Sequence, residues 1–133
     1  VESKLSALPK EAFQVGELIY EASADGKGVA VAKYVDKNLT TIIIPEQISY
    51  AGYVYDVVEI GEFGFVDCPS LTFITIPNSV TSIGVSAFEG CSALDSITFQ
   101  GTIAQWKKIE FGEDWNFKIS TNVVHCADGD VEI

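Results

Sequence analysis

The sequence predicts a mostly β fold with short helices, in which about three coils stack as a short right-handed solenoid between two capping elements. Residues 57–76 align without a gap with residues 80–99, and eight of the twenty aligned positions are identical. The identical positions are almost all apolar or glycine, whereas the variable positions are mostly polar. Stacked coils require this pattern, because each coil lays the same inward side chains on those of its neighbour.

The composition is that of one globular domain. The chain has 133 residues, of which 47% are apolar and 20% are charged, and 19 acidic residues against eight lysines give a formal net charge of -11. Binding to nucleic acid is excluded, because few positive charges are present to neutralise phosphates and there is no arginine. No apolar stretch approaches the roughly 20 residues that span a bilayer. The chain contains no methionine, so we expect a trimmed product whose signal peptide or anchor has been removed.

Each repeat contains one predicted strand. Residues 71–76 and 94–99 fit the pattern L-x-x-L-x-L of leucine-rich repeats, and the distance between the two copies lies within the range of about 20 to 29 residues for such repeats. A degenerate first copy at 39–44 stands farther from the second copy than the second stands from the third. Nine extra residues explain the longer distance, and we expect them to form a hairpin around Ala51-Gly52.

The segment before the repeats is predicted to cap the solenoid. Two strand-like runs, residues 17–23 and 29–34, are joined by a turn-rich connection that is typical of a β-hairpin. Residues 1–14 carry little pattern, and we interpret them as a leader or linker.

The segment after the repeats is predicted to form a helix-strand cap. Thr102 is a suitable N-cap for a short helix over residues 103–109, whose apolar residues recur every three positions and bury Trp106. The chain then returns as a strand near residues 122–126, turns, and ends in residues 131–133.

The predicted domain organisation follows from these elements. A leader at 1–14 precedes a single domain at 15–133, which consists of a hairpin cap with the degenerate coil (15–57), two regular repeats (58–101) and a carboxyl-terminal cap (102–133).

Nucleophilic catalysis has few candidate residues. His125 is the only histidine, so a cysteine-histidine pair would need Cys68, Cys91 or Cys126. Cys68 and Cys91 stand at an inward position of the repeat, where we expect buried free thiols. In-register side chains keep their Cβ atoms farther apart than the separation of roughly 3.8 Å that is usual in a disulfide. His125 and Cys126 are adjacent in a predicted strand and point to opposite faces. We therefore predict no catalytic residue.

A metal or cofactor site has equally little support in the sequence. The alternating carboxylates of Asp128, Asp130 and Glu132 could hold calcium, although the twelve-residue calcium loop with its closing glutamate is missing. A plain turn between two strands is the favoured interpretation. The sequence contains no glycine-rich phosphate loop, no HExxH and no CxxC. We predict neither a metal nor a cofactor.

The repeats also support a resemblance to a known family. The string I-G-x-x-A-F-x-x-C-x-x-L-x-x-I-x-I-P, matched by Ile83-Gly84, Ala87-Phe88, Cys91, Leu94 and Ile97, resembles the BspA-like (Treponema-type) leucine-rich repeats. The segment from Gly101 to Asp130 resembles the terminal module that often closes such arrays. The resemblance covers roughly residues 15–133. Two positions depart from the pattern, since Gly64 replaces the usual alanine and Gln100 the usual proline.

The outward face of the predicted strands is the candidate binding face. The x positions of the strand pattern face solvent, and stacking aligns them in two rows. The first row consists of Ile43, Thr75 and Thr98, and the second row consists of Thr41, Phe73 and Ser96. Phe73 and Ile43 form the most suitable contact patch. Two alternatives stay open: the hairpin at 46–56, with three tyrosines, covers Phe73, or that hairpin itself binds a partner.

The resemblance implies a cell-surface or secreted protein of a host-associated bacterium that is not an enzyme and acts in adhesion or protein-protein binding. We expect a monomer whose ligand is a protein or a glycan, host-derived ligands included. The alternative is a structural spacer, or a domain of a larger surface lipoprotein, that has no ligand of its own.

Overall fold

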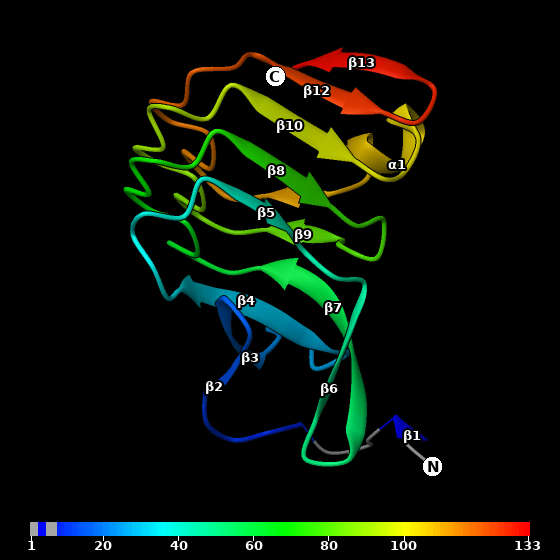
Figure 1. Cartoon of the computed structure of the whole chain (residues 1–133). Coiled ribbons are helices and arrows are strands. Elements are labelled where there is room, and N and C mark those ends of the chain that lie inside the picture. The colour runs from blue at the N-terminus through cyan, green and yellow to red at the C-terminus, as the bar shows by residue number, and fades with distance from the viewer. Residues whose placement is uncertain (1–2, 5–7) are drawn as a thin grey trace.

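Two β-sheets enclose one hydrophobic core in the computed structural model, which describes residues 3–4 and 8–133 (Figure 1). Along its length the chain alternates between the two sheets, so that each coil contributes to both. We call the five-stranded sheet the front sheet; its order is β13-β12-β10-β8-β5. Its strands are β5 (Thr41–Ile43), β8 (Phe73–Ile76), β10 (Ser96–Phe99), β12 (Val123–Cys126) and β13 (Gly129–Glu132).

The front sheet has the register that the alignment of the repeats predicts. Thr41 lies opposite Phe73, and Phe73 lies opposite Ser96, so each residue pairs with its equivalent in the next copy. Strands β5, β8 and β10 are parallel, as stacked coils require. Strand β12 joins them as a further parallel strand, and β13 closes this sheet in antiparallel orientation. The expected strand near residues 122–126 is thus part of the same sheet.

The back sheet carries the amino-terminal hairpin. Its main path runs β11-β9-β7-β4-β3-β2. The antiparallel pair β3–β4 is the expected hairpin, whereas the pairs β4–β7, β7–β9 and β9–β11 are parallel. The bounds are β2 (Phe13–Val15), β3 (Leu18–Ala22), β4 (Val29–Tyr34), β7 (Tyr53–Ile60), β9 (Ser82–Ile83) and β11 (Glu110–Phe111).

The expected leader at 1–14 falls in part on residues 1–2 and 5–7, which lie outside the described residues. Of the remainder, β1 (Ser3–Lys4) pairs with β7, and Phe13 belongs to strand β2. Phe13 is 6% exposed and stacks on Tyr50 with 4.1 Å between the ring centroids. The back sheet therefore includes residues of the expected leader, since β1 joins it through β7 and β2 begins at Phe13.

The hairpin predicted around Ala51-Gly52 is formed by β6 (Gln47–Tyr50) and β7. Its turn uses positive φ at both residues, 54° for Ala51 and 83° for Gly52, which suits a two-residue hairpin turn. The hairpin extends toward the amino-terminal end of the molecule, away from β10 (Figure 1). Tyr50 and Tyr55 pack on Phe13 and, in the described chain, make no ring contact with Phe73. The contacts do not support the alternative in which this hairpin covers Phe73.

The core consists of side chains that repeat from coil to coil. Ile74, Ile97 and Val124 lie side by side on the inner face of the front sheet, and each is 0% exposed. Phe65 and Phe88, which are equivalent in the two repeats, stack with centroids 5.4 Å apart and ring planes 5° apart. Cys68 and Cys91 are also completely buried, as predicted. Identical positions of the repeat thus lie against their own equivalents, as Ile74 does with Ile97 and Phe65 with Phe88.

Glycine is required where the backbones of neighbouring coils meet. A Cβ atom on Gly84 would lie 2.7 Å from the backbone nitrogen of Glu62, closer than real Cβ atoms approach. Gly64 stands where the second repeat has Ala87, and a Cβ there would lie 3.1 Å from the carbonyl oxygen of Val31 in β4. An alanine at this position would therefore crowd both the hairpin cap and the backbone of its own repeat, where Gly61 O would lie 3.2 Å away.

The carboxyl-terminal helix α1 (Ile103–Lys107) begins where predicted and ends two residues earlier than predicted. Thr102 is the N-cap, and its side chain and that of Gln105 form a capping box. Lys108 is the C-cap, and Ile109 donates to the Trp106 carbonyl at 3.1 Å, so the last turn tightens instead of continuing as α-helix. Trp106 is 3% exposed, which confirms its predicted burial.

We predict that Ile97→Ala lowers the free energy of unfolding by about 2 to 5 kcal/mol, because it leaves a cavity in the middle of the front sheet's inner row. Urea denaturation followed by circular dichroism measures the loss. Gln100→Ala, at an exposed position next to the same strand, serves as the control and should change stability by less than about 0.5 kcal/mol. A loss of that small size for Ile97→Ala would show that this row does not form the core.

We also predict that Gly84→Ala costs about 1 to 3 kcal/mol, because the added methyl group must push neighbouring coils apart. Gly61→Ala, at the equivalent position of the preceding repeat, should cost less, since its nearest neighbour is the Val31 oxygen at 3.1 Å. The same denaturation experiment compares the two variants. Equal stability of the Gly84 variant and the native chain would refute the close backbone contact between coils.

Candidate binding face

The six residues of the predicted binding face stand in the two expected rows on the outer side of the front sheet. The register aligns Ile43 with Thr75 and Thr75 with Thr98, and in the second row it aligns Thr41 with Phe73 and Phe73 with Ser96. These positions alternate along each strand with the buried residues of the core. We call this outer surface the front face.

The front face extends beyond the six residues. Thr98 pairs with His125 in β12, and His125 pairs with Asp130 in β13, so the first row crosses all five strands. The Nδ1 atom of His125 lies 2.9 Å from the Oδ1 atom of Asp130. Sequence reasoning missed these two residues because the segment Val-Val-His-Cys lacks the leucine and isoleucine spacing of the repeats. The turn at 128–130 was the available signal, since it returns the chain beside β12.

Exposure is uneven across the six residues. The side chain of Ile43 is 66% exposed and Thr41 is exposed, whereas Phe73, Ser96 and Thr98 are half-buried. Thr75 is 8% exposed, although it lies on the outer side, because Ile43 and Thr98 stand beside it in the row. The exposed apolar surface of the front face is therefore concentrated at β5 and β8, around Ile43 and Phe73.

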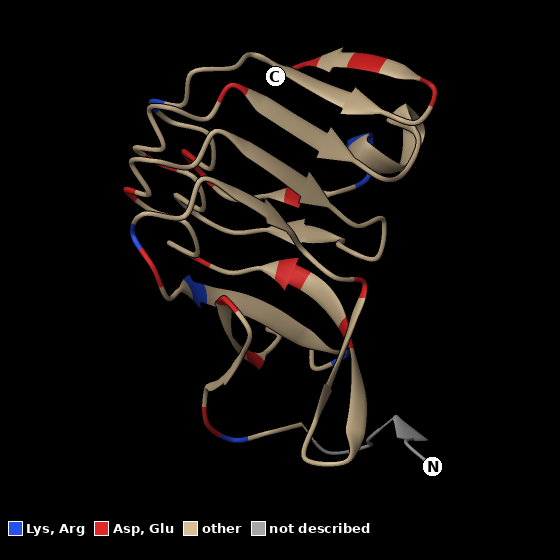
Figure 2. Cartoon of the chain, in the orientation of Figure 1, with Lys and Arg blue, Asp and Glu red and all other residues tan. Residues whose placement is uncertain are grey.

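The front face is uncharged over its first three strands. Strands β5, β8 and β10 contain no acidic or basic residue, although the chain carries 19 acidic residues. Figure 2 shows the contrast, with acidic residues on β13, on β7 and in the connections around this surface. An uncharged surface loses little hydration energy when a partner covers it, whereas buried unpaired carboxylates cost several kcal/mol.

The three cysteines are free thiols with little nucleophilic character. Burial raises the pKa of Cys91 to about 12, and the Cys91 thiol donates to the Phe65 carbonyl at 2.9 Å. Burial also raises the pKa of Cys68 and that of the half-buried Cys126. The thiolate is the reactive form of cysteine, so none of the three is activated for attack.

His125 and Cys126 lie on opposite sides of β12, as predicted. His125 is exposed on the front face, whereas Cys126 packs against the core.

The Asp128 carboxylate accepts from the backbone N–H of Ile103 at 2.8 Å and thereby helps to cap helix α1. No group of three or more histidine, cysteine or acidic side chains in the described chain is arranged to hold a metal ion. The geometry thus assigns Asp128 a structural contact.

We predict that only one of the three thiols reacts quickly with Ellman's reagent in the native protein at pH 8. Cys126 should react first, because it is partly exposed, whereas Cys68 and Cys91 are fully buried and the Cys91 thiol stays protonated below its pKa of about 12. Three thiols should react in denaturant. Fewer than three under denaturing conditions would reveal a disulfide, and rapid native reaction of all three would contradict the packed core.

Comparison with known proteins agrees with the fold. Residues 58–123 match the family model described as the BspA type Leucine rich repeat region (6 copies). No curated protein matches the chain. None of the helices in the described part is long and apolar enough to cross a membrane.

Solved structures of bacterial proteins resemble this chain. A leucine rich cell surface protein from Faecalibacterium prausnitzii A2-165 is 26% identical with a TM-score of 0.68, over 90% of this chain and 34% of its own. A leucine-rich repeat protein from Bacteroides capillosus shares the fold, with 22% identity and a TM-score of 0.64 over 86% of this chain and 97% of its own. The leucine rich repeat protein of T. pallidum is 28% identical with a TM-score of 0.54, over 68% of this chain and 44% of its own. The present chain spans about a third of the length of the Faecalibacterium protein.

Proposed function

Because this chain belongs to the BspA-type leucine-rich repeat family, we propose that it is a non-enzymatic module of a bacterial cell-surface or secreted protein. Its role is adhesion or protein-protein binding, and the front face contacts the partner. The partner is a protein or a glycan, host-derived ligands included. The single observation that carries this proposal is an uncharged surface with exposed Ile43 and half-buried Phe73 in a chain with a net charge of -11.

The location proposed for the module draws on its relatives. The Faecalibacterium protein is described as a leucine rich cell surface protein. Exposed apolar patches that are surrounded by polar residues mark interaction sites. We therefore attribute the uncharged, apolar patch on this acidic surface to a partner that covers it. Raised thiol pKa values support a non-enzymatic role, because the candidate nucleophiles of the chain are protonated at neutral pH.

The size of the front face determines how strongly it binds. Five strands at a spacing of about 4.8 Å, with up to four residues at about 3.3 Å each, cover roughly 24 by 13 Å, or about 300 Å². A standard protein interface buries about 800 Å² on each partner. We therefore expect weak binding by a single copy, and strong attachment only where several copies act together on one surface.

We predict that Phe73→Asp weakens binding to a front-face partner about tenfold or more, because it puts a charge into the apolar centre of the contact. The measurement is surface plasmon resonance of the purified chain against a panel of host-matrix proteins, mucins and surface glycans. Phe117→Asp is the matched control, since Phe117 is 48% exposed in the connection between β11 and β12, outside the front sheet. It should bind like the native chain.

Half-burial of Phe73 could make its aspartate variant unstable, so Ile43→Asp provides a second test at a side chain that is 66% exposed. Thermal unfolding establishes that each variant is folded. Folded Ile43 and Phe73 variants that bind as well as the native chain would overturn the assignment of the front face. No saturable binding by the native chain across the panel would instead favour a structural spacer without a ligand of its own.

A further inference from the structure

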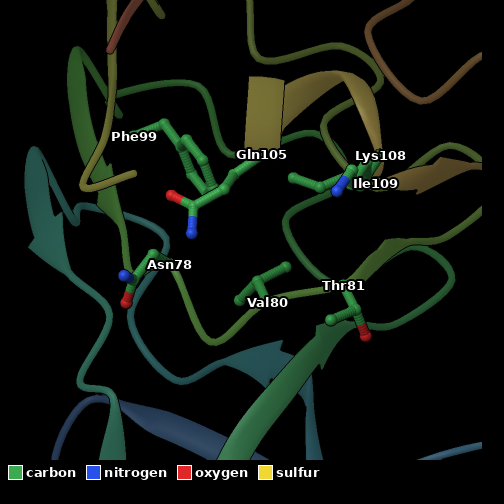
Figure 3. A pocket seen from close by; sticks show the side chains of 7 residues that line it. All are labelled: Asn78, Val80, Thr81, Phe99, Gln105, Lys108 and Ile109. Atoms are coloured by element: carbon green, nitrogen blue, oxygen red, sulfur yellow. The ribbon is translucent and has the colours of Figure 1, made fainter. Parts of the chain in front are cut away.

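A hollow of about 260 Å³ lies between helix α1 and the turn that follows β8 (Figure 3). It contains none of the residues of the front face. Three of its lining residues are apolar and buried: Val80 is 2% exposed, Phe99 is 1% exposed and Ile109 is 6% exposed. These side chains form a rigid apolar floor, and the Phe99 ring is held in place by an edge contact with Trp106 at 5.3 Å between centroids.

Hydrogen-bond donors surround this floor. The Oε1 atom of Gln105 accepts from the backbone N–H of Thr102 at 2.9 Å, so the capping box fixes the orientation of the carboxamide. The Gln105 nitrogen consequently points into the hollow, between Phe99 and Asn78 (Figure 3). Gly101 permits this arrangement, because a Cβ atom there would lie 2.5 Å from Gln105 Oε1 and 2.6 Å from the Phe99 ring. The Gln105 carboxamide nitrogen is thus a hydrogen-bond donor with a fixed orientation beside the apolar floor.

Lys108 adds a positive charge at the same rim. Its ammonium group makes no ion pair and no hydrogen bond with the described residues, and the carboxamide of Asn78 also has no such partner there. Neither side chain therefore makes a polar contact that stabilises the fold of the described residues. Both are exposed and able to turn toward a bound molecule.

The charge of this hollow is opposite to that of other hollows on the described surface. Three of them contain carboxylates and no lysine: one has Glu21, Glu59 and Glu62, another Asp25, Glu59 and Glu110, and a third Glu17. The hollow beside α1 contains a lysine and no carboxylate. In a chain with a net charge of -11 this is a local reversal of sign, and it favours an anionic ligand group at this place.

We propose that the hollow beside α1 binds a carboxylate carried on a compact, partly apolar molecule. The carboxylate accepts charge-assisted hydrogen bonds from the Lys108 ammonium and a hydrogen bond from the Gln105 carboxamide nitrogen, and the body of the molecule rests on Val80 and Phe99. An acidic monosaccharide and the free carboxyl terminus of a peptide both have this chemistry. The proposal is independent of the front face, because no residue is shared.

Two-dimensional NMR of the nitrogen-labelled chain tests the proposal, with the side-chain amide signals of Asn78 and Gln105 as reporters. The probes are N-acetylneuraminic acid and N-acetyl-leucine, each compared with an uncharged partner, the methyl ester of the sugar and N-acetyl-leucinamide. We expect at least one acid to shift the reporters in a saturable manner while the uncharged partners leave them in place. The acid that binds identifies the source of the carboxylate as sugar or peptide.

The variants Lys108→Gln and Lys107→Gln form a matched pair. Both substitutions remove one positive charge from an exposed residue at the end of α1, but Lys107 does not line the hollow. Lys108→Gln should weaken the acid about tenfold or more, as expected for a lost hydrogen bond to a charged group, and Lys107→Gln should change the affinity by less than about twofold. The proposal is overturned if neither acid moves the reporters, if the uncharged partners move them equally, or if both variants weaken binding to the same extent.

Discussion

The structure depends on one constraint: each coil must stack on its neighbour without any shift in register. Ile74, Ile97 and Val124 have no exposed surface because each lies directly beside the equivalent residue of the next strand. A shift of one residue along a strand would turn this whole row toward solvent. The glycines at the backbone contacts, such as Gly84, let the coils approach closely enough for the apolar rows to touch. Core, sheet order and outer surface all follow from this alignment.

The same alignment produces the surface to which we assign function. Side chains alternate between the two sides of a strand, so a register that is fixed by the core on the inner side also fixes the rows on the outer side. Ile43, Thr75 and Thr98 are aligned because Ile42, Ile74 and Ile97 are aligned beneath them. The front face is therefore built on rigid elements, and its exposed residues, such as Ile43, can be exchanged without disturbing the buried row. This separation lets one scaffold carry different outer residues, and it is why family membership alone does not identify a ligand.

Much of the strand register and of the core could be predicted from the sequence, because the repeat places identical apolar residues at a fixed spacing. The register of β8 and β10 follows from the gapless alignment of the two regular repeats, and the burial of Cys68 and Cys91 follows from their inward position. The full width of the front sheet did not follow, since β12 joins through a segment without the repeat pattern. The part of Gln105 in the capping box and the contact of Asp128 with Ile103 were also missed, because each depends on side-chain geometry at the end of α1. The exposure of Thr75 was misjudged because its neighbours in the row cover it.

Methyl cross-saturation NMR with a panel member that binds shows directly whether the register-aligned outer rows are the contact surface. The chain is deuterated and carries protonated isoleucine, threonine and valine methyl groups, and the unlabelled partner is irradiated. We expect signal loss to concentrate on Thr41, Ile43 and Thr98, whereas the exposed Val35 and Val85, which lie outside the front sheet, keep their intensity. Signal loss at Val35 or Val85 with an unchanged front face would show that the partner binds elsewhere on the chain.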